Sequence, residues 1–194
     1  MSKEMKVLFV GNSYTYFNDM PNTFFVKEAE AAGINAEVTA ITKGGYRLSQ
    51  FADSENEQGQ RLRQAIKDKH YDCAVLQEQS LNPIKNEESF LSGVKELKDL
   101  IDAKCFILYA TWGRNEGSPE LEALKLTREE MTEKLSLAYN KAAAEHGMRV
   151  AEVGKAFLEY SGDRDELYDK DKSHPSLLGS AIAARVIFET AMAD

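Results

Sequence analysis

Residues 5–13 read MKVLFVGNS, an apolar run that ends at Gly11 and continues into polar residues. The run is continuous rather than alternating, which is typical of a strand buried on both faces of a parallel sheet. We therefore predict a strand over Met5–Val10. Four further runs of this kind predict four more strands, over Glu37–Ile41, Cys73–Gln77, Cys105–Thr111 and Arg149–Val153.

Amphipathic segments separate these runs and predict helices over Pro21–Ala32, Gly59–Lys69, Ser89–Ala103, Thr127–Glu145 and Ser176–Met192. Gly33 stands where the end of a helix favours glycine, and Thr127 with Glu130 forms a capping-box pattern. The strict alternation of strand and helix selects a doubly wound α/β fold with a five-stranded parallel sheet and right-handed crossovers. At 194 residues, we expect a single domain over residues 1–194.

The composition indicates a globular protein with a substantial core, because 43% of the residues are hydrophobic and 29% are charged. This balance excludes collagen-like, low-complexity and disordered chains. No apolar run approaches the ~20 residues of a membrane span. The first residues do not have the pattern of a signal peptide. We therefore expect no membrane partner.

The charge balance narrows the partners further. There are 24 basic and 32 acidic residues, which gives a net charge of −8. Nucleic acid would be repelled by this charge, and no basic stripe offsets it. Cys73 and Cys105 each open an apolar run, so we expect reduced, buried thiols and a cytoplasmic location. They form neither a disulfide framework nor a spaced metal site, and the sequence leaves the oligomeric state open.

The loops that follow the strands are the expected place of function. In an open α/β sheet, ligands bind beyond the carboxyl ends of the strands. Five loops should meet there: Gly11–Asn18, Thr42–Asn56, Gln77–Glu87, Trp112–Leu124 and Ser161–Pro175.

The first and last of these loops carry a possible nucleophile and base. Ser13 follows the first strand, but its hydroxyl is a weak nucleophile until a base removes its proton. His174 directly precedes the C-terminal helix, and we predict it as the N-cap with Pro175 at the first helical position. Asp171 can fix the tautomer of the imidazole and leave its other nitrogen as a base. Taken singly, Ser13 fits an ordinary strand-to-helix turn better than a catalytic role, whereas His174 fits a capping or hydrogen-bonding role as well as a catalytic one.

An acyl-transfer site also needs hydrogen-bond donors for the oxyanion. The second loop offers the backbone amides of Gly44 and Gly45, which have no Cβ to obstruct a substrate. The third strand ends in Gln77-Glu78-Gln79-Ser80, where Gln77 or Gln79 could donate a side-chain N–H. A flexible turn and solvated loop polarity are the alternative interpretations.

A few other residues of these loops could line a substrate pocket. Trp112 and Arg114 follow the fourth strand and would place an aromatic face beside a charge. Tyr14 and Tyr46 could contribute further aromatic contacts, and Gln77 a polar contact. Plain packing is the alternative role for the aromatic residues.

The order of these motifs resembles that of the SGNH (GDSL-type) hydrolase family, with Gly11-Asn12-Ser13 as the nucleophile block and Asp171-Lys172-Ser173-His174 as the acid-base block. The resemblance implies a flavodoxin-like, three-layer α/β/α fold. It also implies a Ser nucleophile, a His base and an orienting Asp. The implied oxyanion hole consists of the Ser amide, a Gly amide and an Asn side chain, with no metal or organic cofactor.

The third block departs from this family pattern. The family has Gly-x-Asn-Asp where this chain has Gln77-Glu78-Gln79-Ser80. Alignment puts Gln79 at the Asn position with one additional methylene group, and Gln77 is the alternative donor. Gly45, rather than Gly44, is our choice for the glycine donor.

These observations predict a serine esterase with the triad Ser13, His174 and Asp171 and an oxyanion hole of Ser13, Gly45 and Gln79. The predicted substrate is a small acyl ester, such as an acetyl group on a carbohydrate. A flavin- or nucleotide-binding module, with phosphate held by the Ser13–Thr15 loop, is the alternative from another class. A non-catalytic carbohydrate-binding relative is a third possibility.

Overall fold

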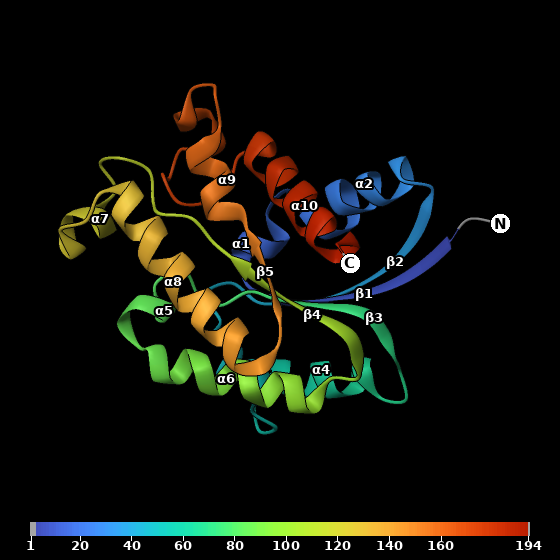
Figure 1. The fold of residues 1–194 in the computed structure, drawn as a ribbon. Coiled ribbons are helices and arrows are strands. Elements are labelled where there is room, and N and C mark those ends of the chain that lie inside the picture. Colours follow the sequence, from blue (N-terminus) through green and yellow to red (C-terminus); the bar gives the residue numbers. More distant parts are fainter. Residues whose placement is uncertain (1–2, 194) are drawn as a thin grey trace.

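The computed structural model describes residues 3–193. Its five-stranded parallel sheet has the order β2-β1-β3-β4-β5 (Figure 1). The strands are β1 (Lys3–Gly11), β2 (Ile34–Thr42), β3 (Tyr71–Leu76), β4 (Ala103–Ala110) and β5 (Arg149–Glu152). Each of the five apolar runs forms one of these strands, and the predicted doubly wound, flavodoxin-like fold is confirmed.

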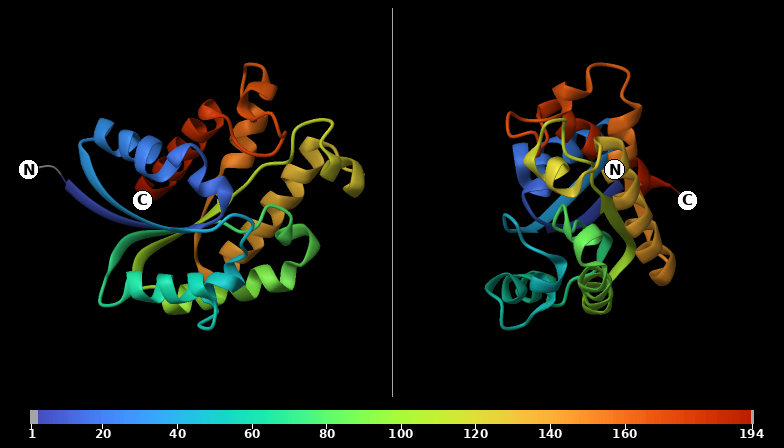
Figure 2. Two further views of the ribbon diagram at one scale, coloured as in Figure 1. Left: turned by 180° about the vertical axis from the view of Figure 1, so that it is seen from behind. Right: turned by 90° about the vertical axis from the view of Figure 1, so that its left-hand side faces the viewer.

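Helices cover both faces of the sheet and complete three layers (Figures 1 and 2). One face is covered by α2 (Val26–Ala31), α9 (Val153–Glu159) and α10 (Leu177–Met192). The other is covered by α3 (Leu48–Ala52), α4 (Glu57–Ile66), α6 (Glu87–Leu100) and α8 (Arg128–His146). Shorter helical segments are α1 (Ser13–Tyr16), α5 (Asn82–Lys85), α7 (Pro119–Leu124), a π-helical turn at Pro21–Phe25 and 3-10 turns at Phe17–Asp19 and Arg164–Leu167.

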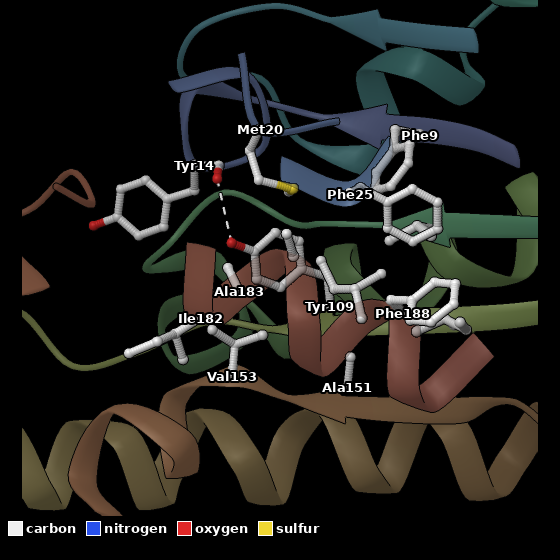
Figure 3. Packing of buried hydrophobic residues seen from close by; sticks show 14 of the residues in the cluster. Phe9, Tyr14, Met20, Phe25, Tyr109, Ala151, Val153, Ile182, Ala183 and Phe188 are labelled. Atoms are coloured by element: carbon white, nitrogen blue, oxygen red, sulfur yellow. Dashed lines mark hydrogen bonds between the residues drawn. The ribbon is translucent and has the colours of Figure 1, made fainter. Parts of the chain in front are cut away.

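The alternation of side chains along β1 explains why its apolar run is continuous. Val7 and Phe9 pack beneath α2, α9 and α10, whereas Leu8 and Val10 pack against the helices of the opposite face. Figure 3 shows Phe9 against Phe25, with their ring centroids 5.2 Å apart in an edge-on arrangement. Each fully buried side chain of this size stabilises the fold by about 1.5–3 kcal/mol. The strand therefore fixes both layers at once, and the loop after β1 is held in place from both sides.

The long helices begin and end largely where the sequence predicts. In the capping box of α8, Thr127 N–H donates to Glu130 Oε2 at 2.8 Å, and Glu130 N–H donates to Thr127 Oγ1 at 3.1 Å. Gly33, just after α2, has a φ of 74°, a left-handed conformation that glycine adopts without strain. The five short helices α1, α3, α5, α7 and α9 were not predicted. They have four to seven residues each, too few to produce a helical period in the sequence.

The start of α10 corrects one prediction. Ser176, not His174, is the N-cap, and its Oγ accepts the Gly179 N–H at 3.1 Å. Pro175 lies outside the helix and pairs with Tyr168 in an isolated antiparallel bridge. Serine is a much better cap than histidine, so the helix starts later and the imidazole has no capping role. Within residues 3–193, we find no helix with the length and apolar character that a membrane crossing requires.

Candidate active site

Ser13 is the first residue of α1, directly beyond the carboxyl end of β1. Asn12 caps this helix through its Oδ1, which accepts the Tyr14 N–H at 3.2 Å. Gly11 must lack a side chain here, since a Cβ would clash with the Thr15 hydroxyl and lie 2.9 Å from Gln77 Oε1. The tight turn therefore sets the serine hydroxyl at the edge of the sheet where the loops meet.

His174 reaches this serine from the other end of the chain. Its Nε2 lies 2.8 Å from Ser13 Oγ, and its Nδ1 forms a hydrogen bond with the Asp171 carboxylate. Asp171 Oδ1 also accepts the backbone N–H groups of Ser173 at 3.0 Å and His174 at 2.9 Å. With Nδ1 donating to the carboxylate, Nε2 is left to accept the serine proton.

The surroundings of Asp171 favour its charged form. Partial burial opposes ionisation, but the hydrogen bonds from the His174 ring and from two backbone N–H groups outweigh it and lower the pKa of Asp171. A carboxylate that accepts several N–H groups is stabilised as the anion. Asp171 is therefore suited to orient the imidazole and to stabilise a positive charge on it.

Aromatic rings hold the histidine from two sides. Phe17 is stacked on the His174 ring with centroids 4.5 Å apart, and Tyr14 meets it edge-on at 5.5 Å. The Tyr14 hydroxyl is hydrogen-bonded to Ser173 Oγ at 2.8 Å. The Tyr14 carbonyl accepts the Tyr109 hydroxyl at 3.3 Å, so α1 is also tied to the core (Figure 3).

The expectation that Trp112 binds substrate is wrong, because this side chain is fully buried. Its indole lies between Tyr14 and Phe157, with ring centroids 4.7 and 4.4 Å away. Its Nε1–H donates to the Ser173 carbonyl at 3.0 Å. Trp112 therefore supports the segment before His174 from the side of the protein core. The Tyr46 ring likewise packs against Phe51 at 5.5 Å rather than lining the cavity.

An open cavity of about 390 Å³ surrounds Ser13. It brings together seven of the predicted site residues, namely Ser13, Tyr14, Gly45, Gln79, Arg114, Asp171 and His174. Ser80 and Glu120 also line it, and neither was singled out from the sequence. A second cavity of about 340 Å³ shares Gly45 and Gln79 with the first. Among residues 3–193, no group of three or more His, Cys, Asp or Glu side chains is arranged to hold a metal ion.

Comparison with known proteins decides the family. No protein-family model matches the sequence, and neither does any curated protein. Among solved structures, the chain is similar to an SGNH hydrolase from Slackia heliotrinireducens, with 30% identity, a TM-score of 0.86 and coverage of 97% of this chain and 99% of that one. The chain belongs to the SGNH hydrolase family.

Two more distant neighbours share the SGNH hydrolase fold. One is a lipase/acylhydrolase from Enterococcus faecalis, with 16% identity, a TM-score of 0.70 and coverage of 95% and 94% of the two chains. The other is a family 3 carbohydrate esterase from Clostridium thermocellum, with 13% identity, a TM-score of 0.68 and coverage of 98% and 96%. The predicted enzyme class, an SGNH/GDSL-type hydrolase, is confirmed by the family. It takes precedence over the flavin- or nucleotide-binding alternative.

The third SGNH block contains two glutamines with different surroundings. Gln77 is fully buried, and its Oε1 accepts the Asn12 N–H and the Thr15 hydroxyl, both at 2.9 Å. Its amide group donates to the Glu78 carbonyl. With donor and acceptor both engaged inside the protein, Gln77 joins the first and third loops and is not available to a substrate.

Gln79 is the glutamine that lines both cavities. Its Oε1 accepts the backbone N–H groups of Leu81 at 2.9 Å and Asn82 at 3.0 Å. These two bonds fix the amide plane, so its Nε2 is the group left to donate to a ligand. The structure thus favours Gln79 over Gln77 as the counterpart of the SGNH asparagine.

The two glycines of the second loop, Gly44 and Gly45, also differ in their surroundings. Gly45 lines both cavities and has a φ of 72°, a left-handed conformation that suits glycine. Gly44 packs beside Tyr16 instead, where an added Cβ would lie 3.0 Å from the tyrosine hydroxyl. The Asn12 Nδ2 donates to the Tyr46 carbonyl at 3.0 Å and ties this loop to the nucleophile turn.

Arg114 also lines the cavity around Ser13. Its side chain is only 13% exposed, donates to Ser80 Oγ at 3.2 Å and lies 3.8 Å from the Glu120 carboxylate. The guanidinium also lies over the Tyr14 ring, 6.0 Å from its centroid. A guanidinium has five N–H donors, so this side chain keeps donors for a polar ligand. Ser80 and Glu120 have no sequence signal of their own, because only the fold brings them to Arg114.

Proposed function

We propose that this SGNH hydrolase removes a small acyl group, such as acetyl, from a carbohydrate by way of an acyl-enzyme intermediate. The observation that carries the proposal is the 2.8 Å approach of Ser13 Oγ to His174 Nε2, with Nδ1 bonded to Asp171. This is the geometry in which an imidazole can take a serine proton during attack.

The reaction follows from these three groups. Ser13 Oγ attacks the ester carbonyl while His174 Nε2 accepts its proton, and Asp171 stabilises the imidazolium that results. The imidazolium then protonates the departing alcohol oxygen, which leaves the acyl group on Ser13. Water, deprotonated at the same Nε2, attacks the acyl carbonyl. The bond to Ser13 Oγ then breaks, Oγ takes back the proton from the imidazolium, and the acid is released.

Three donors would stabilise the negative charge on the carbonyl oxygen. These are the backbone N–H of Ser13 at the start of α1, the backbone N–H of Gly45 and the Nε2–H of Gln79. Gly45 and Gln79 line the same cavity as Ser13, which supports their joint role. Preorganised donors of this kind contribute much of the rate enhancement in acyl transfer.

The polar lining of the cavity supports a sugar as the alcohol part of the substrate. Arg114, Ser80 and Glu120 offer donors and acceptors beside Ser13, as sugar hydroxyls would require. The adjoining cavity gives further room beyond Gln79. The shared fold with a carbohydrate esterase is consistent with this substrate class. The partner is thus a small-molecule ester, and the predicted cytoplasmic location stays a prediction.

A panel of esters tests the proposal. We expect the wild type to hydrolyse p-nitrophenyl acetate faster than esters of longer acids and to release acetate from acetylated sugars. Ser13→Ala should do neither, and only the wild type should be labelled by a fluorophosphonate. Failure of the labelling with intact folding would favour the non-catalytic carbohydrate-binding relative. Equal turnover by Ser13→Ala would remove Ser13 from the nucleophile role.

A further inference from the structure

Glu78 is a fully buried carboxyl group that the proposed reaction does not use. It lies between Gln77 and Gln79 in the loop after β3. Glutamate is almost never fully buried unless its charge is paired or hydrogen-bonded. Its partners therefore indicate what it does.

The partners of Glu78 come from two different loops. The Leu48 N–H, at the start of α3, lies 3.3 Å from both Oε1 and Oε2. The Gln79 N–H donates to Oε1 at 2.5 Å. One carboxylate therefore joins the segment that follows Gly45 to the segment that carries Gln79.

The backbone of Glu78 is itself held on both sides. Its N–H donates to the Tyr139 hydroxyl of α8 at 3.2 Å, and its carbonyl accepts the Gln77 amide. Tyr139 is fully buried and packs edge-on against Phe90 of α6. The carboxylate thus projects from a rigid support in the core toward two surface loops.

We propose that Glu78 is a positioning residue that holds Gly45 and Gln79 at the separation that an oxyanion requires. This inference rests on the proposed function, since Gly45 and Gln79 are two of its three donors. Hydrogen bonds to an oxyanion need donors within about 2.7–3.1 Å of it, and a displacement of about 1 Å can lower a rate by about 10²-fold. A single buried carboxylate that bonds both loops opposes such a displacement.

The ionisation of Glu78 gives this role a measurable signature. Burial raises the pKa of Glu78 to about 7, although the Gln79 and Leu48 N–H groups, the Asn82 side chain and the Arg47 charge favour the anion. The charged or titratable groups that face it are Arg47, before α3, and Tyr139, on α8. Charge-assisted hydrogen bonds are about twice as strong as neutral ones, so protonation weakens the link between the loops.

The test compares the wild type with Glu78→Gln, which keeps the shape of the side chain but cannot ionise. Leu62→Ala, on α4, is the matched control, because it removes a fully buried side chain from the same core layer, and this apolar side chain takes no part in the hydrogen bonds of the Glu78 carboxylate. NMR follows the Leu48 and Gln79 amide protons from pH 5 to 9, and kinetics follows p-nitrophenyl acetate hydrolysis.

We expect the chemical shifts of the Leu48 and Gln79 amide protons to change together, with a midpoint near pH 7, in the wild type and in Leu62→Ala. In Glu78→Gln this change should be absent. The kcat of Glu78→Gln should fall about 10-fold or more with little change in KM, whereas Leu62→Ala should lose thermal stability and keep its kcat. The inference is overturned if the chemical shifts of the two amide protons do not change together with pH in the wild type, or if Glu78→Gln keeps the wild-type kcat. If both chemical shifts change together with pH in a wild type that hydrolyses no ester, the link between the loops is supported and the proposed function is overturned.

Discussion

The two halves of the candidate active site are held by different kinds of interaction. Ser13 and His174 are supported by stacked rings, with Phe17 on the imidazole and Trp112 beneath Tyr14. Gly45 and Gln79 are instead supported by hydrogen bonds that converge on Glu78. The packing of Phe17, Tyr14 and Trp112 involves no carboxyl group, whereas the network around Glu78 is centred on a buried carboxyl that can bind a proton. We therefore expect the aromatic packing around Tyr14 to depend less on pH than the placement of the oxyanion donors.

The largest expected effect comes from removing the nucleophile. Ser13→Ala should lower kcat for p-nitrophenyl acetate by about 10⁴-fold or more, because triad members act as a unit. His174→Ala should cause a similar loss, and the double variant little more. The melting temperature should stay near that of the wild type, since Ser13 is partly exposed at the cavity. Losses that multiply in the double variant would contradict a shared role.

Breaking the aromatic half should affect stability and activity together. Trp112→Ala removes a fully buried indole and should cost about 3–5 kcal/mol in the free energy of unfolding. Its kcat should also fall, because the Ser173 carbonyl loses its donor beside His174. Urea denaturation and ester kinetics measure the two effects. Trp112→Phe, which keeps a stacked ring, should be milder in both; a kcat in Trp112→Ala equal to the wild type would show that the stack does not position His174.

Truncating a donor in the polar half should affect catalysis more than stability. Gln79→Ala should lower kcat by about 10²–10³-fold with little change in KM, the loss typical of one oxyanion donor. Gln77→Ala is the contrasting variant, since it removes an acceptor from two buried partners and should lower the melting temperature more. A change in KM alone would make Gln79 a substrate-binding residue.

The two halves also differ in how far the sequence could predict them. The order of Ser13 and Asp171–His174 on matching loops indicated the family and the layers, because strands buried on both faces leave continuous apolar runs. Gln77 and Gln79 could not be separated, because which of them faces the cavity depends on Asn12 and Thr15 from another loop.

Predictions from neighbouring residues failed where contacts in the tertiary structure decide the role of a side chain. His174 was predicted as the N-cap because Pro175 follows it, but Ser176 caps α10 better and moves the helix start by two residues. Trp112 was predicted to contact substrate because it follows a strand, yet stacking on Tyr14 and Phe157 keeps it buried. In both cases the deciding contact is made by residues that tertiary structure, rather than sequence distance, brings near.

Glu78 should make the stability of the protein depend on pH in a direction opposite to most carboxylates. Its pKa is raised from 4.5 to about 7 by burial, so the folded state binds a proton that the unfolded state has lost. This proton contributes about 3 kcal/mol to the free energy of unfolding below pH 4.5, and the contribution is lost as the pH rises through 7. Urea denaturation at pH 5 and pH 8 should show this loss in the wild type but not in Glu78→Gln. An equal pH dependence in both proteins would mean that Glu78 is not neutral in the folded state at pH 5.

The smallest expected effect tests the wall of the cavity rather than either half of the reacting centre. Arg114→Met keeps much of the apolar stem over Tyr14 but removes the donors beside Ser80 and Glu120. Loss of one or two hydrogen bonds to a polar substrate should lower kcat/KM for acetylated sugars by about 10-fold. Hydrolysis of p-nitrophenyl acetate should change much less, because this substrate has no hydroxyl groups to bind. The ratio of the two activities is therefore the measurement, and it cancels any general loss of folded enzyme. An unchanged ratio would remove Arg114 from sugar recognition and leave the acyl preference as the only constraint on the substrate.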